Sequence, residues 1–383
     1  MGVDTLLTPG TLADGEARRS TRMKRALIVN DCGLFFPSGM VRALQFQPLF
    51  GCSESWQAAF TSRHSESLTR FAYDRRLWAK AIRKGFRYPL KAYTSWWEQK
   101  REDEIVTRAA GYDLVAMIKS PGTPLYRRLR ALRRPRLVMD INDAVWTRQF
   151  AWPGLQELLR EVDGVICEND CVAEYARQFN TRVFVIPDAP QVEMFDRYRG
   201  EVTRKDDRIV IGWIGGSNNI GPLYRILEPL EALFARYPQI HLRIVGASES
   251  VLPKFEQVRF SCRPSFDQNE MVREVLSFHI GLFPLFHNED GRARGTLKAK
   301  IYMSGEAVAV CENYGENPNL VRDGVDGLLA SSQEEWYEKI KYLILNHIER
   351  AAMARRGLEK VRQHFTADKV FSELTSAYDR ILL

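Results

Sequence analysis

Two adjacent glycines, just past the middle of the chain, form a candidate phosphate-binding turn. An apolar run precedes Gly215 and Gly216, and Ser217 and Asn218 lead into a predicted helix. Glycines let a phosphate group approach the backbone, and a helix N-terminus supplies free N–H groups with partial positive charge. The pattern predicts a site for a nucleotide diphosphate, although a tight turn without a ligand has the same signature. The fingerprint G-x-G-x-x-G is absent, which argues against a nicotinamide or flavin cofactor.

A loop that combines acidic and basic side chains follows a later apolar run. Glu289 and Asp290 are suited to accept hydrogen bonds from ribose hydroxyls, and Arg294 and Lys298 to neutralise a diphosphate leaving group. The loop follows a predicted strand, and ligands of open α/β sheets bind at the carboxyl ends of strands. A solvated charged loop without a ligand is the alternative interpretation.

These candidate residues lie in a chain that alternates apolar strands with helical segments. The predicted strands span 24–31, 112–118, 136–140, 163–169 and 182–188, and then 209–214, 241–245, 257–260, 279–284 and 307–311. Helices are predicted over 222–236, 267–276 and 296–304, over most of 56–110, and beyond residue 333. Such alternation is typical of α/β folds with parallel sheets that helices cover on both faces.

The alternation restarts at the glycine turn, so we predict two Rossmann-like domains. A chain of 383 residues also exceeds what one hydrophobic core usually supports. The predicted divisions are a disordered leader (1–22), an N-terminal domain (23–190), a linker (191–207), a C-terminal domain (208–365) and a final helix (366–383).

Composition narrows the class of protein. No run of about 18 or more apolar residues occurs, so no membrane-spanning helix is predicted. The first 22 residues lack the apolar core of a signal peptide. The six cysteines are scattered and lack the spacing of a zinc site, so we expect reduced thiols and a cytoplasmic protein.

A basic, aromatic segment carries more positive charge than the chain as a whole. The stretch 63–101 holds eleven Lys and Arg against three acids, while the net charge of the protein is +7. Within 75–101 these cations alternate with Trp and Tyr, and six further arginines follow over 126–136. Three interpretations stay open: an amphipathic helix pair with an aromatic core, docking on an anionic membrane surface, or stacking on single-stranded nucleic acid.

Several motifs, in order and spacing, resemble retaining GT-B glycosyltransferases of family 4. In the second half these are GWIGGSNN, HLRIVG, IGLFPLFHNEDGRARGTLKAKIYM and NPNLVRDGVDGLLA. In the first half they are FFPSGMVRALQ, LVMDINDAVW and VDGVICENDCVAEYARQFNTRVFVIPD. The resemblance covers roughly residues 24–380 and is weakest over 52–110.

The resemblance implies a GT-B architecture with a nucleotide-sugar donor on the C-terminal domain and no metal or other cofactor. Gly215, Gly216, Ser217 and Lys298 would then face the donor diphosphate. Across the cleft, a loop would meet donor phosphate or acceptor through Ser38, Gly39 and Arg42. The final helix, after Thr366, would cross back to the N-terminal domain.

The sequence departs from the family pattern around the reacting centre. Ala293 and Ile301 stand where members often carry paired glutamates, and Asn142 stands where many carry histidine. Asp140, Asn142 and Asp143 are therefore the candidate catalytic residues that position donor sugar or acceptor. The alternative is that the two aspartates only cap the segment that follows.

The sequence thus predicts a glycosyltransferase of the EC 2.4 class that acts with retention in glycan, glycolipid or cell-surface polysaccharide synthesis. Its predicted partners are a nucleotide-sugar and a glycan or lipid-linked acceptor, at the inner face of the membrane if 75–101 docks there. The alternatives are a catalytically inactive GT-B-like binding protein and a nucleic-acid-directed glycosyltransferase.

Overall fold

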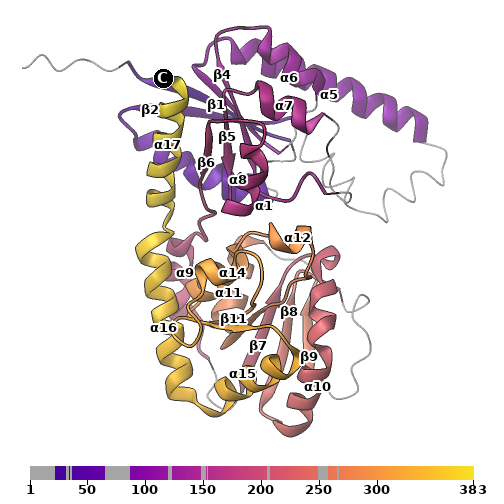
Figure 1. The fold of residues 1–383 in the computed structure, drawn as a ribbon, viewed down its shortest axis with the longest axis vertical. Helices are drawn as coiled ribbons and strands as arrows, with labels where there is room; N and C mark the ends of the chain where they lie inside the picture. The colour runs from indigo at the N-terminus through magenta and orange to yellow at the C-terminus, as the bar shows by residue number, and fades with distance from the viewer. Residues whose placement is uncertain are drawn as a thin grey trace, which may run out of the picture.

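The computed structural model describes residues 22–31, 34, 37–64, 87–119, 123–147, 152, 154–204, 208–248, 258–264 and 267–383. Within them the chain forms two α/β domains, one above the other in Figure 1. The chain passes from one domain to the other twice. Apart from Arg22, the predicted leader lies outside the described residues, as does much of the basic, aromatic segment.

The N-terminal domain is built on a six-stranded parallel sheet. Its strands are β1 (Lys24–Asn30), β2 (Trp56–Ser62), β3 (Leu114–Ile118), β4 (Arg136–Ile141), β5 (Gly164–Cys167) and β6 (Val183–Val185). Their order across the sheet is β2-β1-β3-β4-β5-β6, with every pair parallel. The strands are short apolar runs because both faces are covered, and such strands need not alternate with polar residues.

Helices cover the two faces of this sheet. One face packs against α5 (Arg87–Ala109), α6 (Thr123–Arg130), α7 (Leu155–Glu161) and α8 (Asp170–Arg177). The other packs against the 3-10 helix η1 (Leu44–Phe46), α2 (Gln47–Cys52) and the C-terminal helix α17 (Ala367–Leu382). The short helix α1 (Pro37–Arg42) directly precedes η1.

The C-terminal domain repeats the architecture with a different strand order. Its strands are β7 (Ile209–Ile214), β8 (Ile240–Val245), β9 (Phe260–Arg263), β10 (Ile280–Phe283), β11 (Val308–Glu312) and β12 (Leu328–Ala330). The order is β12-β11-β10-β7-β8-β9, so the chain reverses direction across the sheet between β7 and β10. Ligands of open α/β sheets bind in the crevice at such a switch point.

The helices of the second domain complete its two faces. One face holds α10 (Leu227–Arg236), α15 (Gln333–Leu345) and part of α16 (His347–His364). The other holds α9 (Val192–Tyr198), α11 (Gln268–Leu276) and α13 (Leu297–Ser304). Shorter segments are η2 (Arg199–Glu201), η3 (Ser217–Asn219), η4 (Gly221–Ile226), α12 (Glu289–Arg292) and α14 (Asn317–Leu320). The predicted pair of Rossmann-like domains is confirmed, and the segment predicted as a linker contains helix α9.

Two local predictions are wrong. The stretch that begins at Trp56 is an edge strand, β2, because it pairs with β1 along its whole length, a tertiary contact that its local composition does not reveal. The helix expected from residue 222 is a 3-10 helix up to Ile226, and the α-helix begins at Leu227. Pro229 has no N–H to donate to the carbonyl of Arg225, which instead accepts a hydrogen bond from the side chain of Gln333 at 3.2 Å.

The C-terminal helix returns to the N-terminal domain, as predicted. In Figure 1, α16 runs along the lower domain and α17 continues along the upper one. The buried side chains of α17 join the core of the first domain, and Leu374 and Tyr378 are among them. Asp379 accepts hydrogen bonds from Lys24 at 2.6 Å and from the indole of Trp56 at 2.9 Å. The first domain is therefore completed by the last residues of the chain.

Truncating this helix contact should destabilise the protein. Leu374 is 3% exposed, so Leu374→Ala should lower the free energy of unfolding by about 2–5 kcal/mol. Leu345→Ala is the matched control, because Leu345 is 55% exposed and exposed substitutions usually stay within about 0.5 kcal/mol. Urea unfolding of both variants provides the measurement. Equal losses would contradict the packing of α17 on the first domain.

Candidate active site

A pocket of about 140 Å³ lies at the switch point of the C-terminal sheet. It opens at the carboxyl ends of β7 and β10, and four of the residues predicted to bind a donor line it: Asn218, Asp290, Arg294 and Lys298. The further lining residues, which were not predicted, are Asn219, Pro222, Phe283, Pro284, Leu285, Phe286, Asn288 and Gly291. The pocket therefore combines an apolar wall with amides, one carboxylate and two cations.

Lys298 supplies a cation without a carboxylate partner among the residues that the structure describes. Its ammonium lies 4.7 Å from the ring centroid of Trp213 and 5.5 Å from that of Phe283. Burial, helped by the nearby Arg294, lowers the pKa of Lys298 to about 7. An anion that enters the pocket would meet an amine ready to take up a proton.

Gly215 holds the backbone close to this amine. Its φ of 156° belongs to the range that favours glycine. A Cβ at this position would lie 2.8 Å from the Trp213 ring and 3.0 Å from Nζ of Lys298. A side chain here would therefore push against both groups. Gly216 and Ser217 do not line the pocket; Gly216 precedes η3 and Ser217 is its first residue.

The acidic and basic loop lies against the N-terminal domain. Arg294 donates hydrogen bonds to Asp143 of that domain at 3.2 Å and to Asp290 of its own loop at 2.5 Å. The indole of Trp146 donates to the carboxylate of Glu289. The structure thus brings Asp143 to the pocket, whereas Glu289 points to the seam between the domains.

Arg42 and Asp140 lie in a buried ion pair beneath the seam. Arg42 donates to both oxygens of Asp140 and to Asp188, each at 3.0 Å. A further hydrogen bond runs to the carbonyl of Ile186 at 2.7 Å. Burial lowers the pKa of Arg42, but the two carboxylates outweigh that effect and raise it. Both side chains are almost fully buried, so the geometry gives them a structural role and their predicted contact with substrate stays a prediction.

Three other predicted residues have different surroundings. Gly39 is buried against the carbonyl of Leu34, which a Cβ at position 39 would approach to 2.4 Å. The side chain of Ser38 lies outside the described residues. The Asn142 Oδ1 atom is buried and has no hydrogen-bond partner in the part of the chain that the structure describes, and the same holds for Asp290 Oδ1. Buried acceptors without donors are costly, so both oxygens are suited to hydroxyl groups of a ligand.

Glu312, which was not predicted as a site residue, binds the backbone of the pocket wall. Glu312, 1% exposed at the end of β11, accepts hydrogen bonds from the backbone N–H of Leu285 at 3.3 Å and from His287 at 2.8 Å. Arg225 pairs with the same carboxylate at 3.5 Å. A charged residue that ends an apolar strand was the available signal, because a buried glutamate needs several partners.

Other features of the described residues bear on cofactors and redox state. They contain no group of three or more His, Cys, Asp or Glu side chains placed to hold a metal ion. The five cysteines within them form no disulfide. No described helix has the length and apolarity to cross a membrane. That the protein acts without a metal ion stays a prediction.

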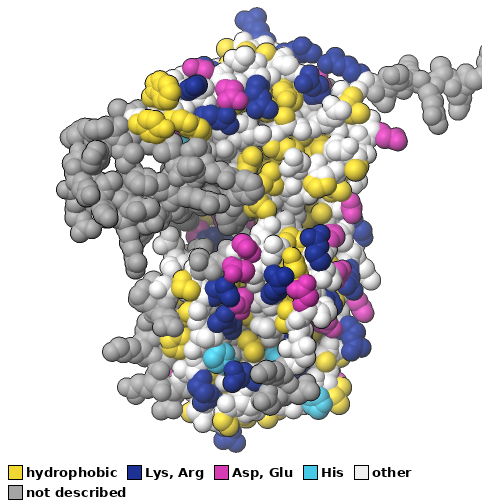
Figure 2. All heavy atoms as spheres, turned by 180° about the vertical axis from the view of Figure 1, so that it is seen from behind, with side chains coloured by type: hydrophobic (Ala, Val, Ile, Leu, Met, Phe, Trp, Pro, Cys, Tyr) yellow, Lys and Arg dark blue, Asp and Glu magenta, His cyan; other side chains and the backbone are white. Residues whose placement is uncertain are grey.

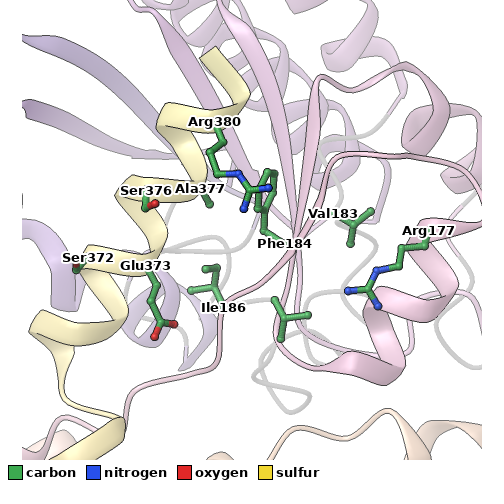
Figure 3. Close-up of a pocket in the computed structure, with 10 residues that line it drawn as sticks. Arg177, Val183, Phe184, Ile186, Ser372, Glu373, Ser376, Ala377 and Arg380 are labelled. Atoms are coloured by element: carbon green, nitrogen blue, oxygen red, sulfur yellow. The ribbon is translucent and has the colours of Figure 1, made fainter. Parts of the chain in front are cut away.

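A larger hollow of about 520 Å³ lies away from the predicted residues, between the edge strand β6 and α17. Figure 3 shows Arg177 and Arg380 on opposite sides of it, with Phe184 between them and the Ser376 hydroxyl on α17. None of the candidate residues lines this hollow, so the smaller pocket at the switch point is the candidate active site.

Comparison with protein families agrees with this choice of domain. Residues 224–376 match a family model described as glycosyl transferase-like. The match spans most of the C-terminal domain and the first part of α17, which is less than half of the chain. No curated protein matches the sequence significantly.

Comparison with solved structures extends the likeness to both domains. The structure of Anabaena Alr3699/HepE in complex with UDP and glucose is 13% identical, with a TM-score of 0.63 over 94% of this chain and 100% of that one. Sucrose-phosphate synthase from Thermosynechococcus elongatus is 14% identical, with a TM-score of 0.64 over 94% and 99%. An α,α-trehalose-phosphate synthase (UDP-forming) from Burkholderia vietnamiensis is 13% identical, with a TM-score of 0.61 over 94% and 99%.

At such identities the likeness is one of fold, and it confirms the predicted GT-B architecture. The family match over residues 224–376 agrees with the predicted glycosyltransferase activity. Membership of family 4 and retention of configuration stay predictions.

The titration of Lys298 should make anion binding depend on pH. An anion raises the lowered pKa of Lys298, so binding is fully supported below about pH 7 and weakens as pH rises through the pKa of the bound state. Calorimetric titration with inorganic pyrophosphate between pH 6 and 9 should show proton uptake. Lys298→Arg is the matched control, because arginine stays charged and pyrophosphate's own titration affects both proteins alike. Identical pH profiles for the two proteins would contradict the assignment.

Proposed function

We propose that the protein transfers a sugar from a nucleotide-activated donor to an acceptor hydroxyl and retains the configuration of the anomeric carbon. The observation that carries the proposal is the pocket at the switch point. There Gly215 places the backbone beside the ammonium of Lys298, which has no carboxylate partner among the described residues. A diphosphate leaving group needs positive charge in its transition state. Lys298 and Arg294 supply that charge from the protein itself, so we propose a reaction without a bound metal.

The chemistry follows from the placement of these groups. The bond from the anomeric carbon to the diphosphate oxygen breaks, and the bond to the acceptor oxygen forms on the same face of the sugar. The acceptor proton passes to an oxygen of the departing phosphate. The protein then has to orient two substrates and stabilise charge on the diphosphate. Asp143, which contacts Arg294 across the seam, and its neighbour Asn142 would orient sugar or acceptor hydroxyls.

A panel of donors tests the proposal directly. Because a structure of similar fold holds UDP and glucose, UDP-glucose is the first donor to test, followed by the sugar conjugates of the other nucleoside diphosphates. A ligand at about 100 times its dissociation constant should stabilise the protein by roughly 2.7 kcal/mol, a shift of a few degrees in Tm. Stabilisation without turnover would instead support a GT-B-like binding protein.

Removing the ammonium should slow transfer sharply. With the donor that the panel selects, Lys298→Ala should lower kcat by about 10²–10³, which is the usual loss when one group that stabilises a developing oxyanion is removed. Lys339→Ala is the control, because Lys339 lies on the distant helix α15 and pairs with Asp323 at 2.8 Å. A Lys298→Ala variant that turns over at the wild-type rate would rule out contact of Lys298 with the diphosphate.

We also propose that helix α5 docks on an anionic membrane surface and so brings the enzyme to a lipid-linked acceptor. Tyr93 and Trp96 are 53% and 59% exposed on this helix, with ring centroids 6.3 Å apart, and the ammonium of Lys100 lies 5.5 Å from the Trp96 ring. Figure 2 shows hydrophobic side chains next to Lys and Arg at the upper left of the first domain. Aromatic rings and cations favour the interface of such a membrane, and these two rings are exposed on the helix.

Vesicle binding tests this surface. The protein should sediment with vesicles of phosphatidylcholine and phosphatidylglycerol more than with phosphatidylcholine alone, and Trp96→Ala should weaken binding about tenfold, the equivalent of about 1.4 kcal/mol of lost burial. Tyr342→Ala is the control, since Tyr342 is 42% exposed on α15. Equal losses for both variants would contradict docking through α5. Salt-sensitive binding to a single-stranded oligonucleotide, lost in Trp96→Ala, would favour the nucleic-acid interpretation.

A further inference from the structure

One short segment of the C-terminal domain makes much of the contact between the domains. Its members Glu289, Arg292, Ala293 and Arg294 each bind a residue of the N-terminal domain. The contacts are Trp146 to Glu289, Arg292 to Glu174 at 2.8 Å, Asn169 to the carbonyl of Ala293 at 3.0 Å, and Arg294 to Asp143 at 3.2 Å. In Figure 1, α12, which holds most of this segment, lies directly below the first domain. The segment therefore joins the two domains.

The same segment lines the candidate active site. Asp290, Gly291 and Arg294 belong to the wall of the pocket. Its volume of about 140 Å³ is below the roughly 300 Å³ at which pockets for small ligands begin. A nucleotide-sugar is larger than this volume, so we expect contacts made by this segment to rearrange when one binds. Arg294 takes part in both the contact between the domains and the pocket.

The two cations of the pocket differ in their partners. Lys298 has no carboxylate partner within the described residues, whereas Arg294 is shared between Asp143 and Asp290. Asp143 and Arg294 are 30% and 27% exposed, so their attraction is that of a partly solvated pair. A diphosphate beside Lys298 offers several oxygens to the planar fork of a guanidinium, which binds phosphate well.

We propose that Arg294 exchanges Asp143 for the donor diphosphate, so that the Asp143–Arg294 bridge holds Arg294 until a donor binds, and donor binding releases Asp143 toward the acceptor. The inference rests on the proposed sugar transfer and adds an order to it, with the donor binding before the acceptor. Once released, Asp143 no longer feels the guanidinium that opposes the effect of burial on its pKa. It then becomes a better acceptor for the hydrogen bond of an incoming hydroxyl.

The exchange predicts opposite effects of one substitution on donor binding and on transfer. Asp143→Asn removes the charge that competes for Arg294, so pyrophosphate and UDP should bind about two- to fivefold more tightly, the range expected for a partly exposed ion pair. With saturating donor, kcat should fall for transfer to the acceptor, and also for transfer to water as the simplest acceptor. Affinity from calorimetry and rates from nucleotide release give the two readouts.

A neighbouring ion pair provides the matched control. Glu174→Gln breaks the Arg292–Glu174 bridge, which joins the same segment to the same domain but whose two side chains are outside the pocket lining and 56% and 59% exposed. This variant should bind pyrophosphate within a factor of two of wild type and keep its kcat. A gain in affinity equal to that of Asp143→Asn would show that any loosening of the seam suffices, and would overturn the specific exchange.

The remaining outcomes separate this inference from the proposed function. If wild type binds pyrophosphate and Asp143→Asn binds it equally or more weakly, the exchange is wrong while sugar transfer stands. If wild type binds neither pyrophosphate nor any nucleoside diphosphate, the proposed function fails and the exchange fails with it. Thermal unfolding of both variants, with unchanged Tm, establishes that the comparison is between folded proteins.

Discussion

The buried guanidinium of Arg42 joins three parts of the chain on which the site depends. It connects the end of α1 to Asp140 at the end of β4, and to Asp188 where the chain first crosses between domains. From the other domain, Lys300 donates to the carbonyl of Asp188 at 2.9 Å. Removing one partner of such a buried ion pair lowers the free energy of unfolding by far more than the intact pair contributes to it. The cluster therefore fixes where the domains meet.

That fixed crossing determines which residues face one another across the cleft. Glu168, at the end of β5, lies so close to Gly295 that a Cβ there would come within 1.8 Å of its carboxylate. Gly295 directly precedes the segment that carries Lys298 and Lys300 on α13. Burial raises the pKa of Glu168 well above its usual value, with Asp188 adding to the effect and Lys300 opposing it. The absence of a side chain at Gly295 thus lets the first domain approach the start of the helix that supplies the pocket's ammonium.

The sequence pattern predicts those features of the fold that depend on the burial of neighbouring residues. The buried strands of both sheets are apolar runs, so β1, β4, β7 and β10 were predictable within a few residues, and so were Asn218, Asp290, Arg294 and Lys298 as residues beside strand ends. Features that depend on contacts between residues far apart in the sequence could not be predicted. The strand β2 exists through its pairing with β1, and Trp146 meets Glu289 across 143 positions of sequence. The family resemblance placed Arg42 near donor phosphate or acceptor, but only the fold shows that it is buried beside two carboxylates.

The pocket accommodates its two basic side chains in two different ways. An unpaired buried charge is unfavourable, and Lys298 can avoid that state by losing its proton, as its lowered pKa indicates. Arginine cannot lose its proton under ordinary conditions, so Arg294 needs the carboxylates of Asp143 and Asp290 instead. The choice of residue type at each position therefore follows from its neighbours: the lysine lies against aromatic rings, and the arginine lies at the seam where both domains supply acids. In a site built in this way, the carboxylates balance the charge of Arg294, and Lys298 can take up a proton when an anion binds.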